Sequence, residues 1–240
     1  MKKAHAMALS IAVVLGSLWG GSWLLMATAA PPTTQPAAAD KAAHEGVVSV
    51  GRLSYAGGRI GKCFAAEFLE ALANETHIRL QRTFVPVPMG SEALFQFPFV
   101  VMTGNGSFTL SPAERANLKA YLNRGGFLLA SAGCSDLAWA QSFRTEIAKV
   151  LPDAKLQKLS LQHPIFKSGP FVVNAILTSR DTAEPAIYGL EVGSRLAVVF
   201  SPVGLNDTAN AGGGCCCCGG NEVRNARDIN ADILAYALTH

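Results

Sequence analysis

Four consecutive cysteines form the most reactive stretch of this 240-residue sequence. They stand in the segment GGGCCCCGG over residues 212–220, and they are Cys215, Cys216, Cys217 and Cys218. Thiolates are the ligands that zinc, copper(I) and iron–sulfur clusters prefer. Neighbouring residues of a strand point to opposite faces, but the flanking glycines permit reversals that would turn two or three sulfurs to one point. The run therefore predicts a soft-metal site, completed by Cys134, His163 or Cys63.

The same cysteines allow a second chemistry, because the sequence also indicates an oxidising compartment in which thiols pair. Adjacent or alternate cysteines of the run would close strained, reducible disulfides, and a bond from the run to Cys134 would tie the loop to another part of the fold. A structural disulfide, a redox-active disulfide and a silent small-residue loop all stay open. Cys63, at the start of an expected helix, is interpreted as a buried, inert cysteine.

Cys134 is also a candidate nucleophile. It follows the apolar run 127–130 and precedes a helical pattern, and a strand–turn–helix connection is where many α/β enzymes hold a nucleophile. A helix N-terminus there would favour the reactive thiolate. His163 would serve as the base, oriented by Asp136 or Glu222. However, the usual second glycine of such an elbow is absent after Cys134, and the proline after His163 is equally typical of a structural turn.

Short apolar runs alternate with amphipathic segments along the chain. This pattern predicts an α/β fold with a mainly parallel, flavodoxin-like sheet and helices on both faces. The expected strands cover residues 47–55, 83–87, 97–103, 127–130, 156–161, 186–190 and 195–200, the last two as a hairpin. Besides a helix from Pro112 to the glycines at 125 and 126, helices are expected over residues 62–73, 137–151 and 222–238.

The helix expected from Pro112 has the clearest start signal. Ser111 is suited to be its N-cap residue, Pro112 fits the first helical position, and Glu114 can close a capping box.

In a parallel sheet, ligands bind beyond the carboxyl ends of the strands. Small or polar residues follow several expected strands, and we interpret them as a ligand rim: Gly57, Gly58, Gly104, Asn105, Gly106 and Ser131. His163 follows the strand expected at 156–161, and the four cysteines follow the strand expected at 195–200. The strand directions therefore predict that these residues share one rim with Cys134, although ordinary turn chemistry explains the glycines equally well.

Residues 1–30 have the pattern of a targeting segment. Two lysines precede an apolar stretch over residues 8–26, and Ala27-Thr28-Ala29 is typical of a signal-peptidase site. The stretch is also just long enough to cross a bilayer, so a cleaved signal peptide and a retained membrane anchor both fit. Either alternative predicts export in a bacterium, to the periplasm or to the periplasmic face of the inner membrane.

The remaining chain divides into a linker and one domain. Residues 31–46 are rich in Pro, Ala and Thr, which predicts a disordered linker, and residues 47–240 are enough for a single α/β domain. Without residues 1–30, which contain two lysines and no acidic residue, 18 basic and 17 acidic side chains remain. No basic stripe is left, so nucleic acid is not expected as a partner, whereas a small-molecule or protein partner stays open.

Several stretches resemble the bacterial domain-of-unknown-function (DUF) family numbered 4159. They are RLSYAGG at 52–58, LFQFPFVVMTGNGSFTLSPAERANLKAYLNRGGFLLA at 94–130, HPIF at 163–166, RLAVVFS at 195–201 and NADILAYALT at 230–239. The resemblance spans nearly all of the expected domain. It implies a flavodoxin-like domain related to the class I glutamine amidotransferases and the trehalose-utilisation-type proteins, and it implies no particular activity.

The sequence also departs from that family pattern. Asn105 stands where the family often has histidine, Ser131-Ala132 replaces a common pair of aspartates, and residues 59–61 replace a segment with tryptophan. We interpret the chain as a member of a cysteine-rich subgroup, in which Cys134 and the run of four cysteines replace polar residues of the rim. Two functional classes stay open: a non-catalytic or ligand-binding module, which the missing elbow glycine favours, and a cysteine hydrolase or amidotransferase-like enzyme.

Overall fold

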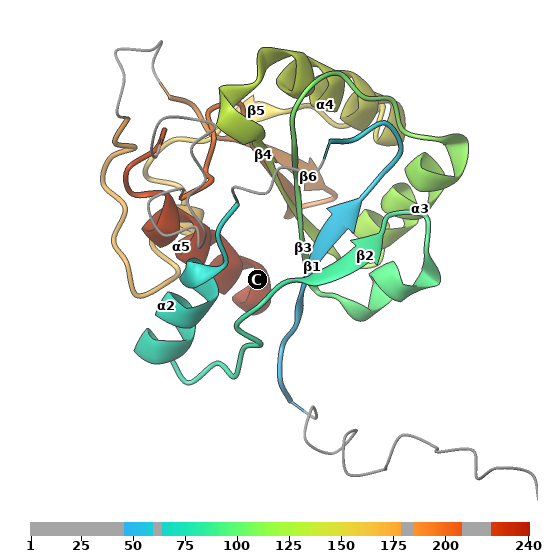
Figure 1. The fold of residues 1–240 in the computed structure, drawn as a ribbon. Helices are drawn as coiled ribbons and strands as arrows, with labels where there is room; N and C mark the ends of the chain where they lie inside the picture. The colour runs from blue at the N-terminus through green and yellow to red at the C-terminus, as the bar shows by residue number, and fades with distance from the viewer. Residues whose placement is uncertain (1–45, 60–63, 179–184, 208–221) are drawn as a thin grey trace, which may run out of the picture. The chain divides into compact units, whose positions relative to one another are not determined.

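The computed structural model describes residues 46–59, 64–178, 185–207 and 222–240, and these residues build a seven-stranded sheet with helices on both faces (Figure 1). The strand order is β2-β1-β3-β4-β7-β6-β5. The strands are β1 (Val50–Ser54), β2 (Val85–Pro88), β3 (Phe99–Gly104), β4 (Phe127–Ala132), β5 (Gln157–Lys158), β6 (Tyr188–Val192) and β7 (Arg195–Ser201). The first five strands of this order are parallel, whereas β6 runs antiparallel to β7 and β5 antiparallel to β6. The predicted α/β class with a mainly parallel sheet is confirmed.

The centre of the sheet is buried on both faces. Every residue of β3 and of β4 is buried, as expected for parallel strands that helices cover on both sides. Because side chains alternate along a strand, Met102 packs on one face while Val101 packs on the other. The two apolar cores of the domain are therefore separated by the sheet itself.

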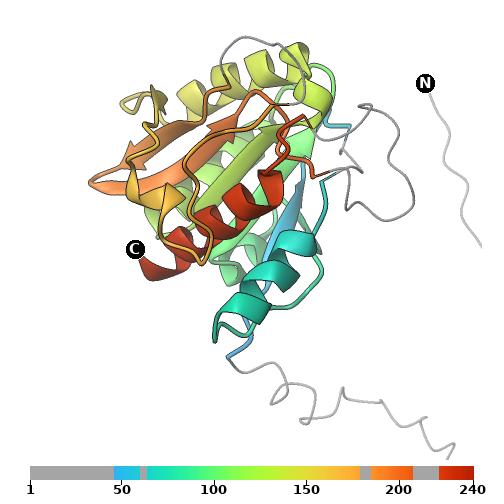
Figure 2. The same cartoon turned by 90° about the vertical axis from the view of Figure 1, so that its left-hand side faces the viewer.

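Among the described residues, two helices cover each face of the sheet. The helices α3 (Pro112–Asn123) and α4 (Leu137–Val150) pack on one side, and α2 (Glu67–Glu75) and α5 (Ala226–Thr239) pack on the other (Figures 1 and 2). Helix α5 is buried on nearly all sides over Ile229–Ala235, although this stretch contains two polar residues. Buried polar side chains in such a helix need hydrogen-bond partners, which makes them informative.

The predicted start of α3 is confirmed. The Ser111 hydroxyl accepts a hydrogen bond from the Glu114 amide, and the Glu114 carboxylate accepts one from the Ser111 amide at 2.7 Å. The same carboxylate accepts a bond of 2.8 Å from the Ala56 amide. The capping box therefore also anchors the loop that follows β1.

The two edge strands are short or interrupted. Pro86 and Pro88 in β2 cannot donate main-chain hydrogen bonds, so this edge is blocked against further pairing. At the other edge β5 has only two residues, where the sequence predicted a strand over 156–161. Strand β5 thus ends three residues earlier than predicted, and the chain from residue 159 to His163 lies outside the named strands.

Some predictions fall on residues outside the described ranges. These are the targeting segment at 1–30, the linker up to residue 45, Cys63 and the four cysteines at 215–218. In the part of the chain that the structure describes, no helix has both the length and the apolar character needed to cross a bilayer.

Candidate functional site

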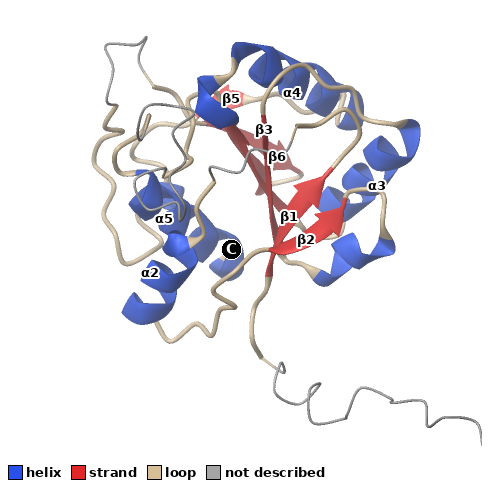
Figure 3. Cartoon of the chain, viewed as in Figure 1, coloured by secondary structure: helices blue, strands red, loops and turns tan. Residues whose placement is uncertain are grey.

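The carboxyl ends of β1, β3, β4 and β7 meet at one edge of the sheet, which we call the C-terminal edge. Figure 3 shows the sheet between α3 and α4 on one side and α2 and α5 on the other. The residues of the predicted ligand rim lie in or directly after three of these strands: Gly57, Gly58, Gly104, Asn105, Gly106 and Ser131. Ser131 lies within β4 rather than after it. The contacts of these residues show which of them have a structural role and are therefore not available to a ligand.

The loops after β1 and β3 are joined to each other. Arg59 and Asn105 form an antiparallel bridge, in which the Asn105 amide donates to the Arg59 carbonyl at 3.1 Å. The Asn105 side chain donates to the Gly133 carbonyl at 2.8 Å and thereby connects a third loop. Asn105 therefore acts as a structural clasp, because it connects the loops after β1, β3 and β4. It lies over the point between β1 and β3, where successive strands begin to be added on the other side of β1.

Gly104 is required by packing beneath this clasp. A methyl group at Gly104 would overlap the Tyr55 hydroxyl and would lie 2.8 Å from the indole nitrogen of Trp139. That nitrogen donates to the Tyr55 hydroxyl at 2.6 Å, and the hydroxyl donates to the Thr103 carbonyl at 3.2 Å. Burial raises the pKa of Tyr55 to about 12, so the phenol stays protonated and structural.

Cys134 lies in a tight turn between β4 and α4. Cys134 and Ser135 both have left-handed backbone angles, with φ of 53° and 52°. Helix α4 begins beyond this turn, because Asp136 is its N-cap residue and accepts from the Trp139 amide at 2.8 Å. Cys134 is disulfide-bonded, and the other five cysteines of the chain lie outside the described residues. The sulfur of Cys134 is therefore not a free thiol that could act as a nucleophile.

His163 does not share the edge with Cys134, and the predicted pairing of the two residues is corrected. After the two residues of β5 the chain turns, with the His163 amide donating to the Ser160 carbonyl. The His163 ring then packs 5.8 Å from the ring of Tyr236, near the end of α5, and lines a cavity with Glu191 of β6. This is the opposite edge of the sheet, so His163 cannot serve as a base for Cys134.

Ser131 belongs to a row of hydroxyl groups at the C-terminal edge, whose other two members, Thr103 and Ser201, the sequence did not indicate. Thr103 pairs with Ser131, and Ser131 pairs with Ser201, so three adjacent strands carry hydroxyls on one face near their carboxyl ends. This is the face covered by α2 and α5, because Val101, two residues before Thr103, packs in that core. All three side chains are buried.

The loop after β7 is fastened to this row. The Ser131 hydroxyl accepts from the Leu205 amide at 2.9 Å, and the Ser201 hydroxyl donates to the Val203 carbonyl. In addition, the Gly204 amide donates to the Ser135 hydroxyl at 3.1 Å. Two of the three hydroxyls therefore position the backbone of residues 203–205. The third, Thr103 Oγ1, has no hydrogen-bond partner within the described structure.

Two buried asparagines follow this loop and α5. Asn230 is fully buried, and its side-chain nitrogen donates to the Leu205 carbonyl at 2.9 Å, but its oxygen has no partner among the described residues. Asn206 is 2% exposed, and its main-chain carbonyl accepts from the Ala65 amide at 2.9 Å. Within the described ranges, neither the oxygen nor the nitrogen of the Asn206 side chain is hydrogen-bonded. Such a buried, unsatisfied amide is rare in folded proteins.

Acidic groups lie close to Asn206. A methyl group at Gly204 would overlap the Glu222 carboxylate and would lie 2.7 Å from the side-chain nitrogen of Asn206, so the glycine gives both groups room. Asp207, the next residue, is buried with a left-handed φ of 49°. In the described parts of the chain no group of three His, Cys, Asp or Glu side chains could hold a metal ion.

The sequence contains a weak indication that Asn206 and Asn230 are buried, but it does not decide the point. Asn230 lies in the apolar helix NADILAYAL, and Asn206 lies six residues after the last buried residue of the RLAVVF run. A polar residue in a helix that is buried on all sides is recognisable only once the neighbours of the helix are known. Asn206, Asn230 and Thr103 form the candidate site at the C-terminal edge, with Glu222 and Asp207 beside it.

The comparisons with known proteins support the family resemblance. The family model described as "Domain of unknown function (DUF4159)" matches residues 49–238 of the chain. No curated protein matches the chain at a significant level. Because the match covers nearly the whole described domain, including the candidate site, the chain belongs to the DUF4159 family of domains of unknown function.

Proposed function

We propose that this chain is an exported, non-catalytic ligand-binding module whose site is the C-terminal edge of the sheet. The observation that carries the proposal is the Asn206 amide, which is buried but not hydrogen-bonded by any described residue. Burying an unsatisfied polar group costs about 1–3 kcal/mol, so a retained group of this kind points to a partner outside the fold. The same edge is where open parallel sheets bind their ligands.

The chemistry of the site suggests the class of ligand. An asparagine side chain offers one acceptor and two donor positions side by side, and Thr103 and Asn230 add a hydroxyl and a carbonyl oxygen. All three groups are uncharged, so they match the hydrogen-bonding groups of a neutral molecule better than an ion. We therefore infer a small neutral molecule with an amide group or neighbouring hydroxyls.

For the cysteines we propose a structural disulfide. Cys134 is disulfide-bonded in the turn whose neighbour Ser135 holds the loop of the candidate site. A sulfur in a disulfide is not a metal ligand, so a site for zinc, copper(I) or an iron–sulfur cluster would have to be built from the cysteines at 215–218 without Cys134. The hydrolase alternative loses support for two reasons, since Cys134 is bonded and His163 lies at the other edge.

The relationship to the glutamine amidotransferase-like domains is part of the same proposal. The five parallel strands follow the order β2-β1-β3-β4-β7, which corresponds to the order 2-1-3-4-5 of flavodoxin-like sheets and supports the relationship. Export and a periplasmic location are proposed from the targeting pattern of residues 1–30. We further propose that this chain represents a cysteine-rich subgroup of its family.

The binding proposal is tested by following the side-chain amide of Asn206 in ¹⁵N-labelled protein by NMR. Acetamide and glucose serve as the probes, one for each of the two chemistries inferred. We expect at least one of them to shift the Asn206 signal saturably, together with signals of residues 203–207 and the first turns of α5. In the variant Asn206→Leu these shifts should disappear.

A matched control is Asn117→Leu on the other face of the sheet. The Asn117 amide donates to the carbonyls of Met89 and Ser91, so this variant should lose stability but keep the response to the probe. If neither probe produced a saturable shift and the Asn206 amide exchanged only with water, the amide would be assigned to a buried water, and the binding proposal would be wrong.

A further inference from the structure

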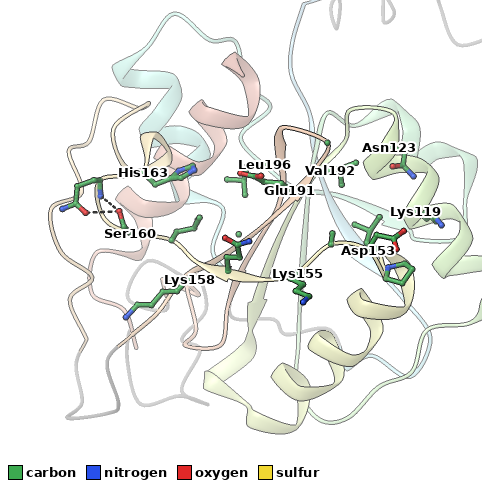
Figure 4. Close-up of a pocket in the computed structure, with 18 residues that line it drawn as sticks. Lys119, Asn123, Asp153, Lys155, Lys158, Ser160, His163, Glu191, Val192 and Leu196 are labelled. Atoms are coloured by element: carbon green, nitrogen blue, oxygen red, sulfur yellow. Dashed lines mark hydrogen bonds between the residues drawn. The ribbon is translucent and has the colours of Figure 1, made fainter.

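A cavity of about 770 Å³ lies at the opposite edge of the sheet, where β6 and β7 form their hairpin (Figure 4). Its size is within the range typical of small-molecule sites. The ends of α3 and α4 and the segment from β5 to His163 form its walls. The cavity shares no residue with the candidate site at the C-terminal edge.

The floor of the cavity is apolar. Leu159 and Leu196 close over Gly189, because a methyl group at Gly189 would lie 2.7 Å from Leu159 and 2.6 Å from Leu196. Leu151 at the end of α4 and Val192 of β6 complete the apolar lining. Such a floor suits the hydrocarbon or aromatic part of a ligand, whose transfer from water is favourable.

The walls carry more positive than negative side chains. The basic residues are Lys119, Lys155 and Lys158, and the acidic ones are Asp153 and Glu191. In the portion of the chain described, neither Lys119 nor Lys155 has an ion-pair or hydrogen-bond partner. Figure 4 shows that Lys119 comes from α3 and Lys155 from the segment before β5, so the two lysines belong to different walls of the cavity.

Compensation of the helix dipoles does not explain these two lysines. The last turn of α3 contains no basic residue, and Arg195 of β7 donates instead to the Leu122 carbonyl at 2.7 Å and to the Gly126 carbonyl at 3.2 Å. The last turn of α4 has Lys149, which pairs with Glu146 at 2.7 Å. Arg195 thus contacts the carbonyl groups at the end of α3, and the basic residue in the last turn of α4 is Lys149.

His163 adds a neutral donor to the same wall. Its Nδ1 atom accepts a hydrogen bond from the Ile165 amide at 3.2 Å, so in the neutral ring the proton is on Nε2. Burial lowers the pKa of His163 below its usual value, which keeps the ring neutral at pH 7. The walls therefore offer several hydrogen-bond donors around an apolar floor.

We propose that this cavity is a second ligand site, which binds an organic anion: a molecule with an apolar body and a phosphate or carboxylate group that contacts the lysines of the walls, Lys119 or Lys155. The proposal is independent of the function proposed for the C-terminal edge. The apolar body would lie on Leu159 and Leu196, and the anionic group would gain charge-assisted hydrogen bonds.

The test measures binding of 1-naphthyl phosphate to the full chain by fluorescence, with 1-naphthoate as the carboxylate arm. Neutral 1-naphthol measures the binding of the apolar body alone, and inorganic phosphate measures the binding of the anionic group alone. We expect at least one aromatic anion to bind at least tenfold more tightly than 1-naphthol and than phosphate alone. The double variant Lys119→Gln/Lys155→Gln should weaken that binding at least tenfold, and added salt should weaken it in the wild type.

The matched control is Lys167→Gln, an exposed lysine outside the cavity, which should leave the affinity unchanged. Lys119 and Lys155 are also exposed, so the double variant should keep its circular dichroism spectrum and melting temperature. The proposal is overturned if neither aromatic anion binds, if 1-naphthol binds as tightly, or if the double variant keeps full affinity. Loss of binding at the C-terminal edge would leave this result unchanged, so the two proposals fail separately.

Discussion

The two edges of the sheet differ in how their polar groups are used. At the C-terminal edge the loops are held by hydrogen bonds of Asn105, Ser131 and Ser201, Cys134 is disulfide-bonded, and Asn206 and Asn230 are buried. At the opposite edge the lysines and the acidic residues of the cavity are exposed around an apolar floor.

This difference follows from the physics of buried and exposed groups. A polar group that is buried without a partner is costly, so it persists only where surrounding contacts hold it in place. An exposed ammonium group costs little, so an open cavity can carry charges without such support. We therefore expect the site proposed at the C-terminal edge to be rigid and preorganised, whereas a ligand would have to order the exposed side chains of the cavity.

Helix α5 runs between the two edges and provides the largest predicted effect. Burial raises the pKa of the Asp232 carboxyl to about 7, and the nearby Asp228 adds to the rise. The native state then holds a proton that the unfolded state releases above its ordinary pKa near 3.8. Stability should therefore fall as the pH rises from about 4 to about 7, by up to about 4 kcal/mol, and should level off above that window.

Urea denaturation between pH 4 and pH 8 measures this dependence. In the variant Asp232→Asn, whose side-chain oxygen can still accept from the Phe171 amide, the dependence between pH 4 and pH 7 should largely vanish. Asp228→Asn is the control and should remove only the smaller share that its charge contributes. An unchanged pH profile in Asp232→Asn would show that Asp232 is not the group that titrates.

Reduction of the disulfide at Cys134 is expected to have the second largest effect. Loss of a native disulfide typically costs about 3 kcal/mol, so a reductant should lower the midpoint of unfolding. Hydrogen exchange should become faster at residues 131–135 and 203–207, which are connected through Ser131 and Ser135. Exchange at 189–196, on the opposite edge, should stay slow. If reduction accelerated hydrogen exchange equally at both edges, the proposed difference between the two edges would be wrong.

The same sample tests the cysteine chemistry. A disulfide at Cys134 uses two of the six cysteines, so at most four thiols should react in the denatured, unreduced protein. Elemental analysis for zinc, copper and iron on this sample tests the metal alternative for residues 215–218. Six reactive thiols without reductant would contradict the disulfide.

Glycine replacements compare the packing of the two edges directly. Gly104→Ala should cost about 2 kcal/mol, because the new methyl group would overlap the hydroxyl of Tyr55 and approach the indole of Trp139. At the hairpin, Gly193 has a φ of 66°, and a Cβ atom added there would meet no other atom within 4 Å. Asparagine tolerates this backbone conformation, so Gly193→Asn should change the free energy of unfolding by less than about 0.5 kcal/mol. Thermal denaturation of both variants gives the comparison.

Local signals in the sequence predicted much of the fold. The capping box at Ser111 and the apolar runs that became β3 and β4 depend on neighbours within a few residues, and the family match over 49–238 agrees with the motifs. The position of His163 depends instead on how long β5 is. Because β5 stops at Lys158, the chain turns to the other edge, and no residue pattern around His163 indicates this.

The candidate site was only partly predictable for the same reason. The rim glycines and Ser131 could be assigned to the C-terminal edge from strand directions alone. That Asn105 is a clasp, and that Asn206 and Asn230 are buried with unsatisfied atoms, depends on contacts between segments far apart in the sequence. Hydrogen-bond satisfaction is a property of the folded arrangement and leaves no trace in residue spacing.

The smallest predicted effect distinguishes a binding role of Asn206 from a structural one. Leucine has the same number and branching of side-chain heavy atoms as asparagine and needs no hydrogen bonds, so Asn206→Leu should raise the free energy of unfolding by about 1 kcal/mol. A gain in stability combined with loss of the NMR response is the pattern expected of a residue kept for function. Asn117→Leu should instead lose about 1 kcal/mol, because it breaks bonds to Met89 and Ser91. If Asn206→Leu were destabilised as much as Asn117→Leu, Asn206 would have a structural partner. The buried polar groups of the C-terminal edge would then stabilise the fold rather than bind a ligand.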